Sequence, residues 1–119
     1  PIMGTTHADL LATDVPCTEL MSDEMIQGDY EKETGKQIVN AFAARPYKEI
    51  PMVLVAGHGP FTWGKTPEEA LYHSQMLEEL AKMASLTLQI NPSTPRLKKT
   101  LVDKHFKRKH GPDSYYGQE

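Results

Sequence analysis

A short apolar run at residues 52–56 (Met-Val-Leu-Val-Ala) restricts the fold of this chain more than any other feature. The glycine-rich segment 57–60 ends the run, and this pattern predicts a buried β-strand. A lone strand is not stable by itself, because its backbone groups need partners in a sheet. Other strand patterns are scarce, whereas helical patterns are common. We therefore expect an α/β fold whose sheet needs partners that this chain scarcely supplies.

Helical patterns flank the strand on both sides. Ser22 is a typical N-cap and predicts a helix that Gly28 interrupts, with a further helical stretch to about residue 44. The segment Thr66-Pro67-Glu68-Glu69 combines a capping box with proline at the first helical position. It predicts a long helix that ends at Asn91-Pro92.

A last helix is expected from Thr94-Pro95 to Gly111, a typical C-terminal glycine. Leu97, Leu101 and His105 are four residues apart and would share one side of it. A lone histidine on such a side is most often a core or interface group. The tail that follows is too short to form an element, and its tyrosines are usually inert unless the tail docks on another surface.

Residues 4–11 are expected to be extended. In a strand, Thr5, His7 and Asp9 would share one face by alternation. Such a row either lines a functional site or forms the solvent-exposed face of a half-buried strand. The pattern alone favours the second interpretation.

Charge is unevenly distributed along the chain, although the net charge is only −3. Acidic residues dominate up to residue 35, and basic residues dominate between 96 and 110. The basic run contains a single aromatic residue, Phe106, which argues against nucleic-acid binding. A solvated helix whose basic residues suit the C-terminal end of the helix dipole is the better interpretation.

The sequence has no apolar run of about 20 residues and no signal-peptide pattern, so it predicts no membrane segment. The single Cys17 allows no disulfide within the chain and favours a cytoplasmic protein.

His58 follows the apolar strand and lies between two glycines, where ligands often bind in α/β folds. A metal ligand and an ordinary turn histidine explain this position equally well. The sequence contains no His-x-His or His-x-x-x-His pair, and a zinc site needs about three protein ligands. Glu31 and Glu33 are two residues apart, so in a helix they do not share a face.

Several segments occur in an order that resembles a known family. They are Gly4-Thr5-Thr6-His7-Ala8-Asp9, Val15-Pro16-Cys17-Thr18, Tyr30-Glu31-Lys32-Glu33-Thr34-Gly35, Gly57-His58-Gly59-Pro60-Phe61, Trp63-Gly64-Lys65, Leu101-Val102-Asp103-Lys104-His105, Arg108-Lys109-His110-Gly111 and Tyr115-Tyr116-Gly117-Gln118. Together they resemble the bacterial L-ribulose-5-phosphate 4-epimerases of the class II aldolase superfamily. The resemblance covers nearly all of this chain but only about the C-terminal half of the family's length.

The resemblance implies a three-layer fold with a central, mostly antiparallel sheet flanked by helices, of which residues 1–119 would be a single partial domain. It implies interconversion of L-ribulose 5-phosphate and D-xylulose 5-phosphate, in pentose catabolism, by retro-aldol cleavage and re-formation of the carbon 3–carbon 4 bond. A divalent metal, typically zinc, would stabilise the enediolate as a Lewis acid. The phosphorylated pentulose would bind in a homotetramer with active sites at subunit interfaces.

By the same resemblance, Asp9 and Tyr116 are the catalytic acid/base residues, one for each face of the aldehyde intermediate, and the tyrosine reaches in from the neighbouring subunit. His58 is a metal ligand, and Thr5, Glu31 and His105 are supporting residues. The remaining ligands and the phosphate-binding residues would lie in an N-terminal half absent from this chain, so we expect the chain alone to be inactive. The alternatives are a related aldolase or dehydratase acting on another sugar phosphate, and a non-catalytic oligomerisation domain.

Overall fold

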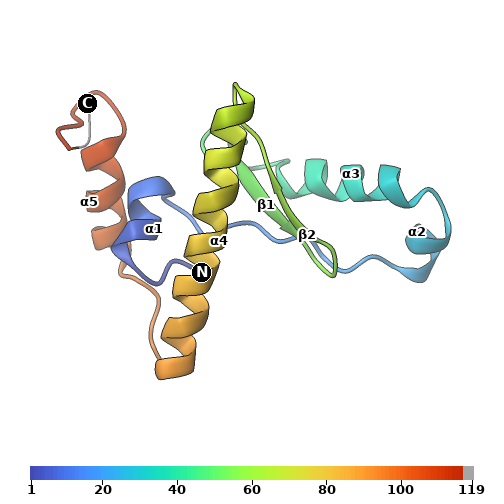
Figure 1. Cartoon of the computed structure of the whole chain (residues 1–119), viewed down its shortest axis with the longest axis horizontal. Coiled ribbons are helices and arrows are strands. Elements are labelled where there is room, and N and C mark those ends of the chain that lie inside the picture. Colours follow the sequence, from blue (N-terminus) through green and yellow to red (C-terminus); the bar gives the residue numbers. More distant parts are fainter. Residues whose placement is uncertain (117–119) are drawn as a thin grey trace. The chain divides into compact units, whose positions relative to one another are not determined.

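A computed structural model describes residues 1–116 of the chain (Figure 1). The described elements, in order, are α1 (Thr5–Leu10), α2 (Asp23–Gln27), α3 (Tyr30–Ala41), β1 (Met52–Val55), β2 (Gly59–Thr62), α4 (Pro67–Ile90) and α5 (Lys99–Lys109). They belong to two compact units: Val15–Leu77 forms one, and Pro1–Asp14 with the chain from Glu78 onward forms the other. No helix among these residues is long and apolar enough to cross a membrane.

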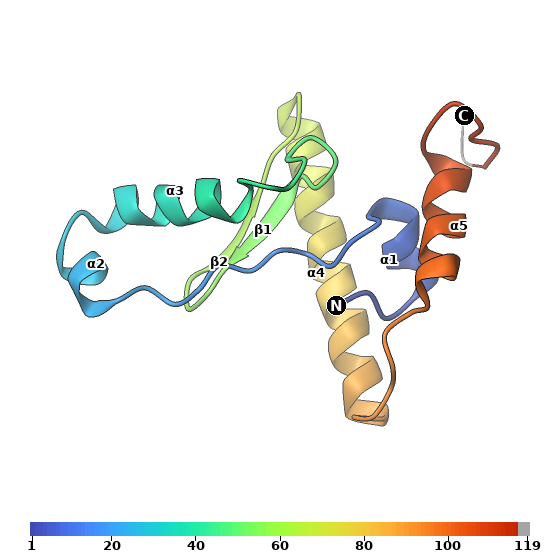
Figure 2. The same cartoon turned by 180° about the vertical axis from the view of Figure 1, so that it is seen from behind.

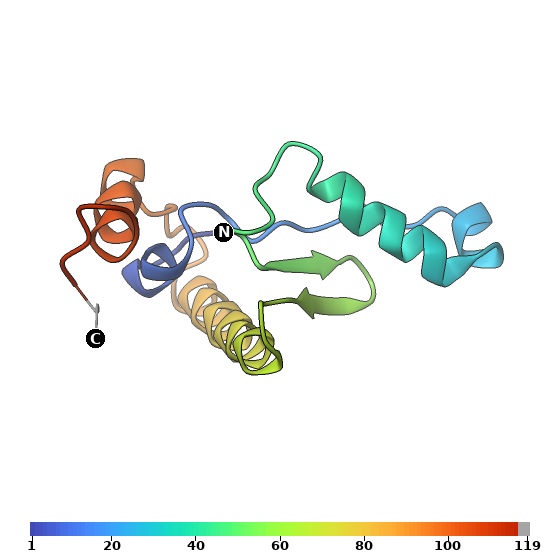
Figure 3. The same cartoon turned by 90° about the horizontal axis from the view of Figure 1, so that it is seen from above.

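The predicted strand is confirmed as β1, and its partner is a strand that the sequence pattern did not reveal. β1 pairs antiparallel with β2 (Figure 3). In this register Met52 lies opposite Thr62. The glycine-rich segment was expected only to end the strand, but it also turns the chain back. Gly57 has a φ of 73°, a conformation that glycine adopts without a steric penalty. Cys17 adds an isolated parallel bridge to Leu54 on β1.

The mixed helix and strand content agrees with the expected α/β class. In the described residues the sheet has two strands, and their antiparallel pairing agrees with the expected sheet type. Met52 and Val53 are completely buried, so β1 carries the core of its unit.

The helix start at Ser22 is confirmed, because its hydroxyl accepts a hydrogen bond from the Met25 amide. Gly28 ends α2 as predicted, and α3 contacts both α2 and β1. α3 ends at Ala41, three residues before the expected end. The amides of Phe42 and Ala43 bond to carbonyls three residues back, which is turn geometry and not α-helix.

The long helix predicted from its capping box is confirmed as α4. The Thr66 hydroxyl accepts from the Glu69 amide at 3.2 Å, and the Glu69 carboxylate in turn accepts from the Lys65 amide. Leu77 and Leu80 are its two buried apolar residues. Both hydrogen bonds join residues between positions 65 and 69, so the local pattern was enough to predict where this helix starts.

Gly64 packs tightly against the first turn of α4, and replacing it with alanine should destabilise the chain. A Cβ at this position would lie 2.8 Å from the Ala70 amide nitrogen, a backbone atom that is held in the helix. We expect Gly64→Ala to lower the free energy of unfolding by about 1–3 kcal/mol, measured by urea unfolding. Gly35→Ala in α3 is the matched control, because its Cβ would meet nothing within 4 Å. It should stabilise the helix by about 0.5–1 kcal/mol, and equal effects of the two changes would contradict the packing argument.

The expectation that residues 4–11 are extended is wrong, because they form helix α1. Ala8 and Leu11 are both buried and lie three residues apart, a helical spacing that the polar alternation obscured. α1 packs side by side with α5, as the views from both sides show (Figures 1 and 2). Ala8 has no exposed surface, and it shares a small core with Ile2 and Val102.

The last helix starts at Lys99 and not at Thr94. Residues 94–98 are not helical, and the Leu97 amide donates to the Ile2 carbonyl at 3.0 Å instead of to a helical carbonyl. Leu97 therefore packs on the core from outside the helix, and the predicted stripe of Leu97, Leu101 and His105 does not form. Val102 is the buried residue of α5, whereas Leu101 is 37% exposed.

Candidate acid–base site

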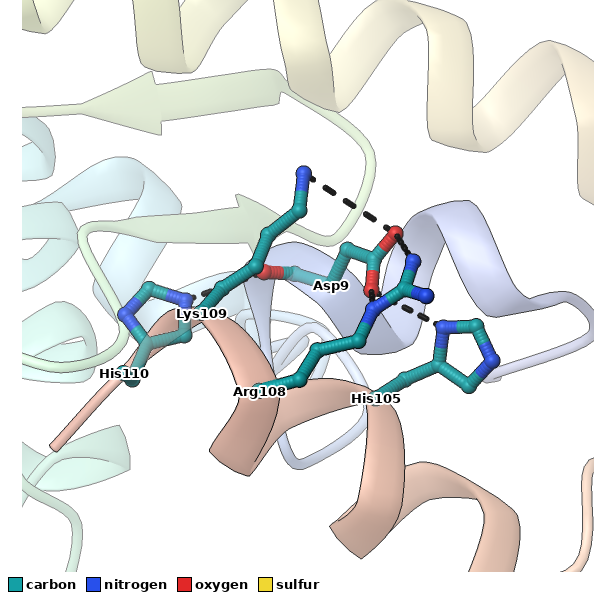
Figure 4. A network of polar contacts seen from close by, with 5 residues as sticks. All are labelled: Asp9, His105, Arg108, Lys109 and His110. Atoms are coloured by element: carbon teal, nitrogen blue, oxygen red, sulfur yellow. Dashed lines mark hydrogen bonds and ion pairs between the residues drawn. The ribbon is translucent and has the colours of Figure 1, made fainter. Parts of the chain in front are cut away.

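Asp9 lies on the last turn of α1 and is surrounded by polar side chains of α5 (Figure 4). Its Oδ1 accepts from His105 Nδ1 at 2.9 Å and from Arg108 Nε at 3.1 Å. Its Oδ2 accepts from Arg108 Nη2 at 2.9 Å, with Lys109 Nζ at 3.9 Å. The Asp9 carbonyl also accepts from His110 Nε2. One carboxylate thus ties α1 to the end of α5.

Helix geometry explains why α5 supplies these groups together. His105, Arg108 and Lys109 follow the i, i+3, i+4 spacing that places side chains on one face. The side chains of Asp9, His105 and Arg108 are only 18%, 17% and 23% exposed. The bidentate contact between Arg108 and Asp9 is therefore shielded from much of the solvent, and it is stronger than a typical surface ion pair.

Asp9 is held in its ionised form. Burial alone would raise its pKa, but hydrogen bonds from Arg108 and His105 oppose this and leave the pKa below its ordinary value of 3.8. An ionised carboxylate only accepts hydrogen bonds, so the ring nitrogen Nδ1 of His105 and the guanidinium nitrogens of Arg108 must act as donors. Of these three side-chain hydrogen bonds, Oδ1 accepts two and Oδ2 accepts one.

Tyr116 lies against the same arginine. The Arg108 guanidinium carbon is 4.3 Å from the centroid of the Tyr116 ring, a cation–π distance, and Lys109 Nζ is 5.5 Å from that centroid. The amides of Tyr115 and Tyr116 both donate to the Arg108 carbonyl at 3.0 Å. The tail therefore docks on its own helix, and Asp9 and Tyr116 contact one guanidinium. The Gly117-Gln118 part of the sequence motif lies outside the described residues.

The predicted row of Thr5, His7 and Asp9 does not exist, because α1 is a helix. Thr5 lies one turn before Asp9, on the same side of α1. His7 is buried elsewhere, with Nε2 3.0 Å from the Thr13 carbonyl. Burial lowers the pKa of His7, so this ring is a neutral core group.

Glu31 and His58 belong to the other unit of the chain. Glu31 is exposed in the first turn of α3. His58 is exposed in the turn between β1 and β2, where its ring centroid lies 5.3 Å from that of Phe61 and 6.5 Å from that of Tyr30. The rings beside His58 belong to Phe61 and Tyr30, and neither residue is a usual zinc ligand.

The family that the sequence resembles typically depends on a divalent metal, which raises the question of whether residues 1–116 fit one. Over this range there is no group of three or more His, Cys, Asp or Glu side chains that could hold a metal ion. His58 offers one imidazole, and a zinc site usually takes three or four protein ligands. The described residues alone therefore do not fit the metal.

The sequence interpretation missed Arg108, Lys109 and His110 as parts of the site. They belong to the basic run that was assigned to a solvated helix face. Their spacing from His105 was the available signal, but it indicates a shared helix face and does not reveal the carboxylate opposite. Asp9 is 99 residues from Arg108, so only folding brings the pair together.

Residues 1–85 match the family described as Class II Aldolase and Adducin N-terminal domain. The match covers well over half of the chain, and the chain belongs to this family. Asp9, Glu31 and His58 lie within the match, whereas His105, Arg108 and Tyr116 lie beyond it.

Proposed function

We propose that this chain is part of an L-ribulose-5-phosphate 4-epimerase. Membership of the class II aldolase family supports aldolase- or epimerase-type chemistry in general. The observation that carries the narrower proposal is the placement of Asp9 and Tyr116 on one guanidinium. It supports the pair of acid/base groups that the sequence resemblance implies.

Epimerisation at carbon 4 requires two proton transfers. Carbon 4 is β to the ketone, so its hydrogen is not acidic and direct deprotonation is slow. Removing the proton from the carbon 4 hydroxyl lets the carbon 3–carbon 4 bond break, which gives the enediolate of dihydroxyacetone and glycolaldehyde phosphate. After the aldehyde rotates, the bond re-forms on its other face, and the new alkoxide takes up a proton. One group on each side of the aldehyde is needed, and a carboxylate and a phenol suit these steps.

The proposal includes features that residues 1–116 do not carry. The zinc ligands other than His58, the residues that bind the substrate phosphate and the remaining layers of the three-layer fold would come from chain upstream of Pro1. The complete enzyme would be a cytoplasmic homotetramer with active sites between subunits. Thr5, Glu31 and His105 would support the site.

The direct test compares this 119-residue chain with the same chain extended upstream. We expect the extended form to bind stoichiometric metal and to interconvert L-ribulose 5-phosphate and D-xylulose 5-phosphate, and the short form to do neither. Metal binding and turnover by the short form would overturn the assignment. An extended form that cleaves a sugar phosphate without epimerising it would be a related aldolase, and an inert one would favour a non-catalytic domain.

The subunit that supplies the tyrosine can be tested by mixing. The resemblance places Tyr116 in the neighbouring subunit's site, whereas the single chain holds it over its own Arg108. Asp9→Asn and Tyr116→Phe subunits of the extended enzyme, mixed and reassembled, should regain part of the activity if two chains share a site. If no activity returns, one chain provides both groups.

A further inference from the structure

Arg108 contacts the candidate site in two ways. Its guanidinium contacts the Asp9 carboxylate and the Tyr116 ring, and its carbonyl accepts from the amides of Tyr115 and Tyr116. We propose that Arg108 is the positioning residue of the site, a single residue that orients the Asp9 carboxylate, the Tyr116 ring and the backbone of the tail. The catalytic meaning of this role rests on the proposed function, but the positioning itself does not.

The contact between Arg108 and Asp9 sets the orientation of the carboxylate plane and also stabilises its negative charge. Arg108 uses Nε and Nη2 for the two carboxylate oxygens, at 3.1 and 2.9 Å. A guanidinium fork matches a carboxylate in this way, whereas a lysine ammonium is a point charge and leaves the carboxylate free to turn. His105, Lys109 and His110, from the same helix and its cap, also face Asp9. His105 bonds to Oδ1, and His110 bonds to the backbone carbonyl of Asp9.

The contact with Tyr116 holds the ring and leaves it accessible. The ring lies on the guanidinium, while the Arg108 carbonyl takes the amides of Tyr115 and Tyr116. Tyr116 nevertheless keeps 52% of its surface exposed, so a substrate can reach it. Arg108 therefore holds Tyr115 and Tyr116 at a defined place on α5, through its side chain and through its carbonyl.

The test begins with the 119-residue chain and needs no substrate. By NMR, we would titrate the Asp9 carboxyl carbon and measure amide hydrogen exchange at Tyr115 and Tyr116. Arg108→Met should raise the Asp9 titration midpoint and accelerate exchange of the two amides by about two- to fivefold, the loss expected for an exposed cation–π contact. Lys107→Met, an equal change of charge at an exposed position one residue away on α5, should change neither. If Arg108→Met behaves like Lys107→Met, the proposal is wrong.

Arg108→Lys separates orientation from charge and guards against misfolding of the methionine variant. We expect it to restore neither measurement fully, because lysine lacks the fork. Full restoration would show that charge alone is sufficient and would overturn the positioning role.

In the extended enzyme, Arg108→Lys should lower kcat by about a hundredfold with little change in KM, the scale of a misplaced acid/base group. It should also move the acidic limb of the pH profile to higher pH. An unchanged kcat and profile would contradict the role in catalysis. If the unmutated extended enzyme shows no epimerisation, the proposed function fails, while the NMR comparison still decides whether Arg108 positions the two groups.

Discussion

Asp9→Asn is expected to lower the free energy of unfolding by about 2 kcal/mol at neutral pH. The asparagine keeps the size of the side chain but loses the charge that holds Arg108 and His105. Both of those donors are partly buried, so their hydrogen-bonding capacity would not be fully replaced by water. The loss should appear in urea unfolding of the 119-residue chain at pH 7.

The same substitution should change the response to acid. The pKa of Asp9 in the folded chain lies below its ordinary value of 3.8, so the unfolded chain binds the proton more readily. The stability that Asp9 contributes is therefore complete above about pH 5 and is lost as the pH falls through the lower, folded value. The difference between the wild-type chain and Asp9→Asn should be constant from pH 7 to pH 5 and should shrink towards pH 3.

Asp103→Asn is the matched control for Asp9→Asn. Asp103 makes its ion pair with Lys99, whose side chain is 84% exposed, and its own side chain is 38% exposed. Such a pair contributes little, so the control should change stability by no more than about 0.5 kcal/mol. Equal losses in the two variants would show that the Asp9 cluster is no more than a surface ion pair.

Tyr116→Phe is expected to suppress epimerisation by the extended enzyme by about 10²- to 10⁴-fold, the usual contribution of a general acid or base. The phenylalanine keeps an aromatic ring for Arg108 and leaves both tail amides in place, so only the hydroxyl is removed. Metal content and the free energy of unfolding should stay close to those of the unmutated enzyme. Rates of carbon 4 epimerisation, measured with metal content on the same samples, check this expectation.

Tyr115→Phe removes the same hydroxyl from the adjacent residue, and it should keep nearly full activity. Tyr115 is 73% exposed, and its backbone amide donates to the Arg108 carbonyl in the same way as that of Tyr116. The two variants therefore share the effect on the tail and differ in which phenol is lost. Full activity in Tyr116→Phe would end the two-sided proton-transfer scheme, and loss of activity in Tyr115→Phe alone would move the role to Tyr115.

The sequence by itself determined the elements whose signals are local. Ser22 starts α2, Gly28 ends it, and the capping box at Thr66 starts α4, because each signal is a hydrogen bond or a backbone preference within a few residues. The apolar run at 52–56 predicted β1, although the strand is stable only because β2 pairs with it. Asp9 and Tyr116 entered only through the resemblance to the epimerases, since neither position has a distinctive local pattern.

The tertiary structure decided what depends on contacts between distant residues. Residues 5–10 are helical because burial of Ala8 against α5 outweighs a polar alternation that suits a strand. Leu97 stays outside α5 because its amide bonds to Ile2. The partners of Asp9 were also decided at this level. The sequence of a basic run does not show whether its side chains face water or a carboxylate. The carboxylate that Arg108 binds belongs to Asp9, 99 residues away in the sequence.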